Sequence, residues 1–254
     1  MDLPLKDKFA LVTGASGTIG SAIAKRLAEE GASVLVHFHA SHEEADNVVQ
    51  IIRSKGGLAE LVSADLAERN GPSNLIDQLD LAFNGRFAGR LDILVNNAGT
   101  LAMDSIVDTT DESFDRLFNV NVRALFQLSR EAARRMSKQN WGRIINIGSV
   151  FGQAAYFPGL STYSGTKFAV QGLTRGWSRD LGEMGITVNN IQPAVIQADP
   201  APDSGAIVDA MKTYTSIKRF GKPEEVAEAV AFLVSTKSGF INGANLNVDG
   251  GWGS

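Results

Sequence analysis

The first thirty residues place a short apolar strand, a glycine-spaced turn and an amphipathic helix one after another. Residues 9–12 are apolar, glycines stand at positions 14, 17 and 20, and residues 22–30 have the composition of a helix. Strand, glycine turn and helix in this order form the context in which a glycine motif indicates phosphate binding at a helix N-terminus. Gly14 allows a tight turn, Gly17 lets the backbone approach a pyrophosphate, and Gly20 lets the helix pack closely. A glycine-rich turn without a ligand is the alternative.

Strands and helices alternate along the rest of the chain. Apolar, β-branched segments end near positions 37, 63, 95, 149, 191 and 249, and helical periodicity fills the segments between them. This alternation predicts an α/β doubly wound (Rossmann) fold, a seven-stranded parallel sheet flanked by helices. Helices after the first are expected at residues 41–57, 72–87, 111–139, 162–182 and 223–234.

The chain has 254 residues, 44% of them hydrophobic, and no proline- or serine-rich linker divides it. We therefore expect one dinucleotide-binding domain over residues 1–254. Helical periodicity fails at about 194–218, apart from a short helical piece at 207–214. A long irregular segment after a strand is usually functional, so we predict a substrate lid there.

Composition excludes several classes of function. The chain has no cysteine, which excludes disulfides and thiolate chemistry, and its net charge of −4 argues against a nucleic-acid partner. His37, His39 and His42 lie in one segment with no second cluster to complete a metal shell, so we interpret them as solvated residues and expect no metal. The charged N-terminus and the lack of a long apolar run predict a cytoplasmic protein with no membrane span.

Tyr163 and Lys167 stand four residues apart at the start of a predicted helix. At that spacing they share one helix face, so the ammonium can lie beside the phenol and lower its pKa. A general acid/base near neutrality requires such a group. Ser149 ends the strand before this helix, where parallel sheets present ligand-binding groups. A chance surface pair is the alternative for Tyr163 and Lys167 taken alone.

These motifs occur in a characteristic order: the glycine loop, Asp65, Asn96-Asn-Ala-Gly99, Asn121, Ser149, Tyr163-x-x-x-Lys167 and Asp249-Gly-Gly251. Together they resemble the short-chain dehydrogenase/reductase family over almost the whole chain. Within the family, the chain most resembles the branch that includes 3-oxoacyl-acyl-carrier-protein reductases. The glycine spacing departs from the usual family pattern, because Thr18 stands where the second glycine is common. Ala198 likewise stands where a threonine commonly contacts the nicotinamide.

The resemblance implies a role for each matching residue. Tyr163 would be the general acid or base, Lys167 would lower its pKa and bind the nicotinamide ribose, and Ser149 would hold the carbonyl oxygen. Asn121 would anchor a water that links Lys167 to solvent. The residues implied for the cofactor site, besides Tyr163 and Lys167, are Gly14, Ser16, Gly17, Thr18, Ile19, Gly20, His39, Ser41, Asp65, Leu66, Asn97, Ala98, Gly99, Pro193 and Ile196.

The end of the second predicted strand bears on cofactor choice. No acid follows it until Glu43, whereas an acid there would favour NAD by bonding the ribose 2′-hydroxyl. His39 and Ser41 suit a phosphate better, so we predict NADP, with NAD possible. Asp65 is placed to bond an adenine edge, and a helix N-cap is its alternative role.

The substrate is predicted to be a small-molecule ketone, reduced reversibly to an alcohol. Apolar and aromatic residues between Ser149 and Tyr163, among them Phe151, Tyr156 and Phe157, would form a pocket wall, with Met211 and Tyr214 added from the lid. A 3-oxoacyl-acyl-carrier-protein reductase is the named alternative. Its carrier would need a basic docking surface, for which the candidates are Arg134, Arg135, Lys138 and Arg143. A solvated helix end is the alternative for these residues.

Two further interpretations are minor: a regulator that senses the dinucleotide without redox chemistry, and an epimerase or dehydratase, which only the glycine spacing favours. The family resemblance also implies a homotetramer formed through the helices at about 112–139 and 162–182.

Overall fold

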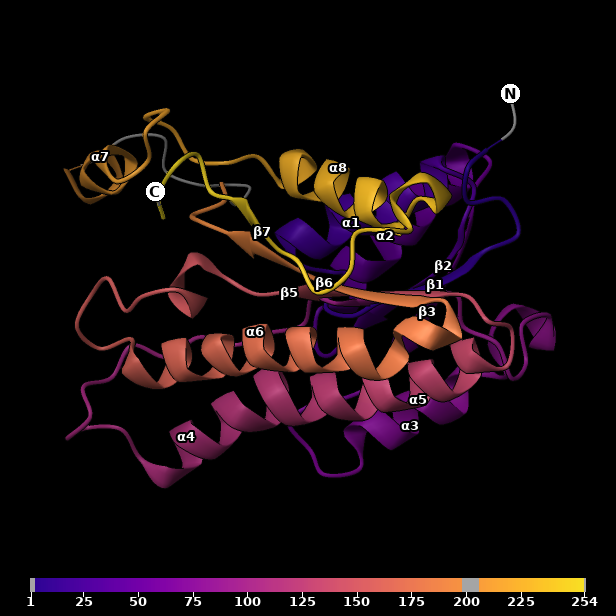
Figure 1. Cartoon of the computed structure of the whole chain (residues 1–254), viewed down its shortest axis with the longest axis horizontal. Helices are drawn as coiled ribbons and strands as arrows, with labels where there is room; N and C mark the ends of the chain where they lie inside the picture. The colour runs from indigo at the N-terminus through magenta and orange to yellow at the C-terminus, as the bar shows by residue number, and fades with distance from the viewer. Residues whose placement is uncertain (1–2, 198–205, 254) are drawn as a thin grey trace.

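The computed structural model describes residues 3–197 and 206–253, and its centre is a parallel sheet of seven strands (Figure 1). The strand order is β3-β2-β1-β4-β5-β6-β7, so the direction of winding reverses between β1 and β4. β1, β2, β4, β5 and β6 are buried along their whole length, as expected for a sheet covered on both faces. The strands are Phe9–Val12, Ser33–Phe38, Leu58–Ser63, Ile93–Asn96, Gly142–Ile147, Ile186–Pro193 and Asn245–Val248, from β1 to β7.

Helices cover the two faces of the sheet in separate layers. One face carries α1 (Thr18–Glu29), α2 (His42–Ser54) and α8 (Pro223–Val234); the other carries α3 (Gly71–Leu79), α4 (Asp111–Phe118), α5 (Leu125–Ser137) and α6 (Ser161–Leu181) (Figure 1). Each layer buries its own apolar cluster against the sheet. α7 (Ala206–Thr213) lies beyond the sheet, near the C-terminus (Figure 1). The doubly wound, seven-stranded fold predicted from the sequence is confirmed.

The topology gathers the sequence motifs at one edge. β1 and β4 are neighbours, and the glycine loop leaves the end of β1 while residues 97–99 leave the end of β4. In doubly wound sheets ligands bind outside the carboxyl ends of the strands, where the winding reverses. Ser149 follows β5 and Pro193 ends β6, so the predicted chemistry shares this edge.

Two predicted helices differ from the sequence expectation. The helix expected at 72–87 ends at Leu79, because Phe83 and Asn84 have φ of 53° and 56°, values that a right-handed helix does not contain. Phe83 instead donates its backbone N–H to Glu60 Oε2 at 2.8 Å. The helix expected at 111–139 is interrupted by π-helical turns at Asn119–Ala124.

The predicted lid segment includes residues 198–205, with Ala198, which lie outside the described residues. Among the described residues, no helix is long and apolar enough to cross a membrane, and no cluster of three metal-ligating side chains occurs.

Candidate active site

The glycine loop is shaped by contacts that a larger residue would break. Gly14 has φ of +61°, and a Cβ atom there would lie 3.0 Å from Ala98 Cα. A Cβ on Gly20 would lie 2.3 Å from the Gly14 oxygen, whereas on Gly17 its nearest neighbour, the same oxygen, would be 3.5 Å away. Packing therefore requires glycine at 14 and 20, and leaves Gly17 open toward the groove outside.

The loop leads into the N-terminus of α1. Gly17 is the residue before that helix, and no side chain caps it. The first N–H groups of the helix are thus available to an anion, which the helix dipole also attracts. The unusual glycine spacing still produces a tight turn that leads into an uncapped helix N-terminus.

Asn97 fastens the loop to the end of β4. Its side-chain Nδ2 donates to the oxygens of Thr13 and Gly14, at 2.8 and 3.0 Å. The Thr13 hydroxyl accepts the backbone N–H groups of Asn97 and Ala98, both at 2.9 Å. Asn97 therefore positions the glycine turn as well as lining the groove.

A groove of about 500 Å³ runs along this edge. Arg116, from α4, also lines it, a residue that sequence reasoning missed because it lies far from the motifs along the chain. Thirteen predicted cofactor residues line the groove: Gly14, Ser16, Gly17, Thr18, Ile19, Gly20, His39, Ser41, Asp65, Leu66, Asn97, Ala98 and Gly99.

His37 was predicted to be solvated, and that prediction is wrong. The ring is buried in β2, where Nδ1 accepts the Gly14 N–H at 3.0 Å and Nε2 lies 3.1 Å from the Ala64 oxygen. Because Nδ1 accepts, the proton must be on Nε2, which donates to Ala64. Burial lowers the pKa of His37 to about 4, so the ring is neutral at physiological pH and joins the glycine loop to the end of β3.

His39 and Asp65 both line the groove and contact each other, with 3.4 Å between His39 Nε2 and Asp65 Oδ2. Asp65 does not cap a helix, because α3 begins only at Gly71. Its Oδ1 accepts the Ala67 N–H at 2.8 Å and so stabilises a local turn. The N-cap alternative is therefore wrong, and the side chain lines the groove.

A second cavity of about 220 Å³ adjoins the groove and shares Ile19, Asn97, Gly99 and Thr100 with it. Ser149, Tyr163, Lys167 and Pro193 all line this cavity. The fold thus brings together residues predicted from four separate motifs.

Burial dominates the electrostatics of Tyr163 and Lys167. It raises the pKa of the Tyr163 phenol, while a hydrogen bond with the Ser149 side chain acts in the opposite direction. It lowers the pKa of Lys167 to about 8. The Lys167 ammonium donates to the Ile147 oxygen at 2.9 Å and lies 5.6 Å from the centre of the tyrosine ring. The predicted lowering of the tyrosine pKa by Lys167 is therefore not found, because desolvation of the phenol outweighs its hydrogen bond with the Ser149 side chain.

Asn121 lies in the π-helical turns that interrupt the α4–α5 segment, a type of irregularity that is frequent at functional sites. Its Nδ2 donates to the Thr100 oxygen and to Thr166 Oγ1, at 2.9 and 3.1 Å, and its Oδ1 accepts the Thr100 N–H at 2.8 Å. The Asn121 side chain thus joins its own segment to those of Thr100 and Thr166. Asn121 Oδ1 and Lys167 Nζ both lie beside Gly99, at 3.4 and 3.7 Å from the position of a Cβ there.

Ile196 does not line either cavity. It forms a β-bridge with Gly221 and packs against the core beside α1, α2 and α8. The other predicted residue at the end of β6, Pro193, does line the second cavity.

Only part of the basic surface considered for a carrier protein is exposed. Arg134 and Lys138 are exposed, whereas Arg135 and Arg143 are buried, and Arg135 pairs with Asp80 and Glu131. These residues also stand where α5 ends and β5 begins. Since α5 returns from the carboxyl edge of the sheet to its other edge, its C-terminal end lies at the edge opposite the second cavity.

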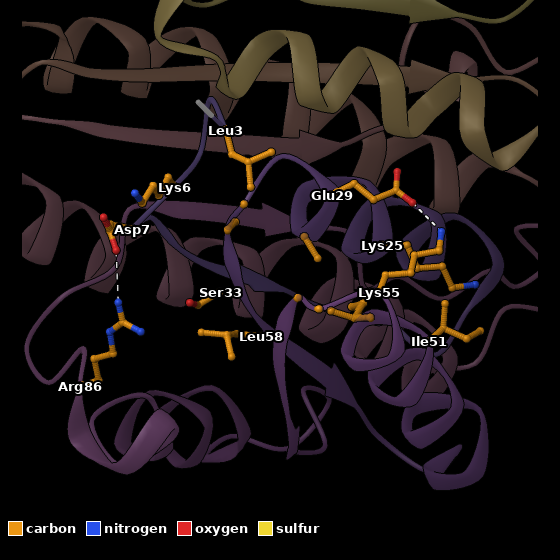
Figure 2. Close-up of a pocket in the computed structure, with 16 residues that line it drawn as sticks. Leu3, Lys6, Asp7, Lys25, Glu29, Ser33, Ile51, Lys55, Leu58 and Arg86 are labelled. Atoms are coloured by element: carbon orange, nitrogen blue, oxygen red, sulfur yellow. Dashed lines mark hydrogen bonds and ion pairs between the residues drawn. The ribbon is translucent and has the colours of Figure 1, made fainter. Parts of the chain in front are cut away.

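Figure 2 shows another groove, of about 470 Å³, at the edge where the strands begin. It carries the ion pairs Lys55–Glu29 and Arg86–Asp7, at 2.7 and 3.2 Å. α1 and α2 both end here, and Lys55, the C-cap residue of α2, complements the negative end of that helix dipole. We therefore place no anion site in this groove.

The topology and the paired cavities define the class of protein: a doubly wound α/β protein with a groove and an adjoining cavity at the edge where the winding reverses. Comparison with known proteins agrees. A sequence model described as Enoyl-(Acyl carrier protein) reductase matches residues 14–253. The chain belongs to the short-chain dehydrogenase/reductase family.

Individual relatives have several functions. The chain is 37% identical to a 3-oxoacyl-acyl-carrier-protein reductase, FabG of Staphylococcus aureus, over 96% of this chain and 97% of the relative. It is also 37% identical to the cyclic-di-GMP-binding biofilm dispersal mediator protein of Escherichia coli, over 97% and 98%. A short-chain dehydrogenase from Burkholderia cenocepacia, solved in complex with NADP, superposes with a TM-score of 0.90 at 41% identity, over 99% of this chain and all of that one.

Proposed function

We propose that this protein is an NADP-dependent carbonyl reductase that converts a ketone reversibly to an alcohol. The observation that carries the proposal is the convergence of Ser149, Tyr163 and Lys167 in a cavity that adjoins the glycine-loop groove. A proton donor and an oxygen-binding group beside a dinucleotide groove are what carbonyl reduction requires.

The groove fits a dinucleotide. A Cβ atom on Gly20 would lie only 2.3 Å from the Gly14 oxygen, so the loop has no room for a side chain there, and the uncapped start of α1 offers N–H groups to a pyrophosphate. His39 and Ser41 would take the 2′-phosphate, which makes NADP the preferred cofactor over NAD. When bound, the nicotinamide supplies the hydride, and the protein supplies position and the proton.

In the proposed chemistry, Ser149 donates a hydrogen bond to the substrate oxygen and orients it toward Tyr163. Tyr163 donates its proton to that oxygen as negative charge develops there, and takes a proton back in the reverse direction. The raised pKa of the phenol keeps it protonated at neutral pH, the form that reduction needs. Lys167, whose pKa is about 8, can exchange a proton near neutrality and would resupply the tyrosine.

Asn121 would act through the main chain. Its side-chain amide protons are already donated to Thr100 and Thr166. A water linking Lys167 to solvent would therefore be held by the main-chain carbonyl oxygen of Asn121. This role stays a prediction, as does the lid over about 194–218.

Reduction of a 3-oxoacyl thioester on a carrier protein is the second candidate, favoured by the similarity to FabG. The expected basic docking surface is not present in the form predicted, because Arg135 and Arg143 are buried. A non-catalytic dinucleotide sensor is the third candidate. The similarity to the Escherichia coli relative, which is named for binding cyclic-di-GMP, supports it. Intact Ser149, Tyr163 and Lys167 favour the enzyme.

We also propose a cytoplasmic homotetramer. Phe114, Phe126 and Phe168, on α4, α5 and α6, are 46%, 40% and 45% exposed, which makes an apolar surface suited to a second copy of the chain. Light scattering of the purified protein measures the number of chains, and a monomer would contradict this part of the proposal.

The test of the proposed function is the loss of reduced-cofactor absorbance with aryl ketones, ketoesters and an acetoacetyl thioester, using NADPH and then NADH. The proposal predicts that NADPH is consumed with a ketone. Preference for the thioester would favour the second candidate, and tight cofactor binding with no turnover in either direction would favour the sensor.

A further inference from the structure

His37 binds two successive N–H groups of the glycine loop. Its ring Nδ1 accepts the Gly14 N–H at 3.0 Å, and its main-chain oxygen accepts the Ala15 N–H at 2.7 Å. The Gly17 N–H is donated within the loop, to the Gly14 oxygen at 3.2 Å. With these groups used, the uncapped N–H groups at the start of α1 are left to bind a phosphate.

The same ring is fixed on its other side to the end of β3. Nε2 donates to the Ala64 oxygen at 3.1 Å, and the next two residues, Asp65 and Leu66, line the groove. His37 also lines the groove and is only 2% exposed. One buried ring thus holds the glycine loop in a fixed position relative to the strand end that is predicted to bind the adenosine half of the cofactor.

The ring acts through its hydrogen bonds and not only through its volume, because both nitrogens are used. Gly14 has φ of +61°, and its oxygen accepts Asn97 Nδ2 at 3.0 Å, so Asn97 and His37 hold this turn from two sides. In the part of the chain that the structure describes, Nδ1 is the one acceptor of the Gly14 N–H. Loss of this acceptor leaves an N–H unpaired inside the protein, so the turn has to move to find another partner.

We propose that His37 is a positioning residue for the cofactor: it fixes the glycine loop so that the start of α1 meets the pyrophosphate of a dinucleotide whose adenosine half lies at the end of β3. This role rests on the proposed dinucleotide site. Since His37 acts through the turn at Gly14, its loss weakens the binding of the pyrophosphate and leaves the adenosine contacts in place.

The test compares two ligands that share an adenosine 2′-phosphate: NADP, which has the pyrophosphate, and 2′-AMP, which lacks it. Calorimetry gives both affinities for the wild type and for His37→Leu, whose apolar side chain fills the space without an acceptor. NADP affinity falls by roughly tenfold, the effect of one buried hydrogen bond, and 2′-AMP affinity stays within about twofold. His42→Leu, at an exposed histidine in the first turn of α2 and outside the groove, is the matched control and changes neither affinity.

Two further variants separate the acceptor from the donor of the ring. Asparagine carries its Oδ1 as many bonds from the backbone as histidine carries Nδ1, so His37→Asn can still accept the Gly14 N–H and restores NADP affinity to within about threefold of the wild type. Glutamine has its polar atoms one bond farther out, near the place of Nε2, so His37→Gln loses NADP affinity as His37→Leu does. Either of these two variants decides the test where the other fails to fold.

A purely structural role for His37 predicts a different pattern. NADP and 2′-AMP affinities would then fall together, and His37→Asn would bind NADP no better than His37→Leu. Either result overturns the positioning role, and so does an NADP affinity that His37→Leu and His37→Gln leave unchanged.

Steady-state kinetics separates this inference from the proposed function. With a ketone as substrate, His37→Leu raises KM for NADPH by about the same factor and leaves kcat close to that of the wild type, because Ser149, Tyr163 and Lys167 line the other cavity. If the wild type reduces no ketone, the proposed function fails, and the two affinities alone decide the role of His37. If the wild type does not bind NADP, the positioning role is overturned together with the dinucleotide site.

Discussion

Replacing Gly20 by alanine tests whether the glycine loop is built as the structure indicates. The new Cβ would lie 2.3 Å from the Gly14 oxygen, 2.5 Å from Asn97 Nδ2 and 2.9 Å from Ala15 Cα, closer than real Cβ contacts. Two of these neighbours are backbone, and the loop is closed by the Ala15 N–H donated to the His37 oxygen at 2.7 Å. The start of α1 therefore has to move away from the loop.

The size of the effect follows from three opposing contributions. Alanine in place of glycine stabilises a helix by about 1 kcal/mol. Overpacking costs about 1–3 kcal/mol, and the loss of an Asn97 hydrogen bond to the loop costs about 1 kcal/mol. Gly20→Ala should thus lower the free energy of unfolding by about 1–3 kcal/mol, or Tm by roughly 2–10 °C in a chain of this length. NADP affinity should fall as well, because the phosphate-binding turn is displaced.

Thermal unfolding by circular dichroism, with and without NADP, measures both effects. Gly17→Ala is the control on the same loop, since its Cβ would meet only the Gly14 oxygen, at 3.5 Å. That variant should change the unfolding free energy of the free protein by less than about 1 kcal/mol, and should lose mainly the stabilisation given by NADP. An unchanged Tm for Gly20→Ala, or an equal fall for Gly17→Ala, would refute the reasoning.

Two further changes test the groove. His39→Asp should lower the affinity for NADP relative to that for NAD by about tenfold, because the new carboxylate repels the 2′-phosphate. Calorimetry measures both affinities, with His42→Asp as the control. An unchanged ratio of the two affinities would place the 2′-phosphate elsewhere. His37→Asn should remove a pH dependence of the free energy of unfolding. The pKa of His37 falls from 6.5 to about 4 on folding, so the neutral ring stabilises the folded protein fully above pH 6.5. This stabilisation is lost as the pH falls toward 4, by up to about 1.4 kcal/mol per pH unit. Urea unfolding at pH 7, 5.5 and 4.5 measures it, and an equal slope in the variant would contradict the assignment.

Local spacing was enough to predict the fold and most of the groove. Alternating strands and helices leave few topologies, and in a parallel sheet the residues after successive strands must meet at one edge. Gly14, Asp65, Asn97 and Ser149 each follow a strand, so their convergence could be read from the sequence.

Properties that depend on burial could not be predicted in this way. His37 was expected in solvent because it ends a strand, yet the turn of the glycine loop covers it and supplies a donor. The pKa of Tyr163 was expected to fall because Lys167 is four residues away, yet desolvation is the larger effect. Arg135 was a candidate for a docking surface, with a solvated helix end as the alternative, but it is buried in an ion-pair cluster with Asp80 and Glu131.

The central claim is that Tyr163 transfers the proton in carbonyl reduction, and Tyr163→Phe tests it most directly. NADPH oxidation with a saturating ketone, measured beside NADP binding by calorimetry, gives both required values. The proposed mechanism predicts that turnover falls by at least about a hundredfold, while NADP affinity stays close to that of the wild type. Turnover retained in the variant would contradict the assignment of Tyr163 as the acid.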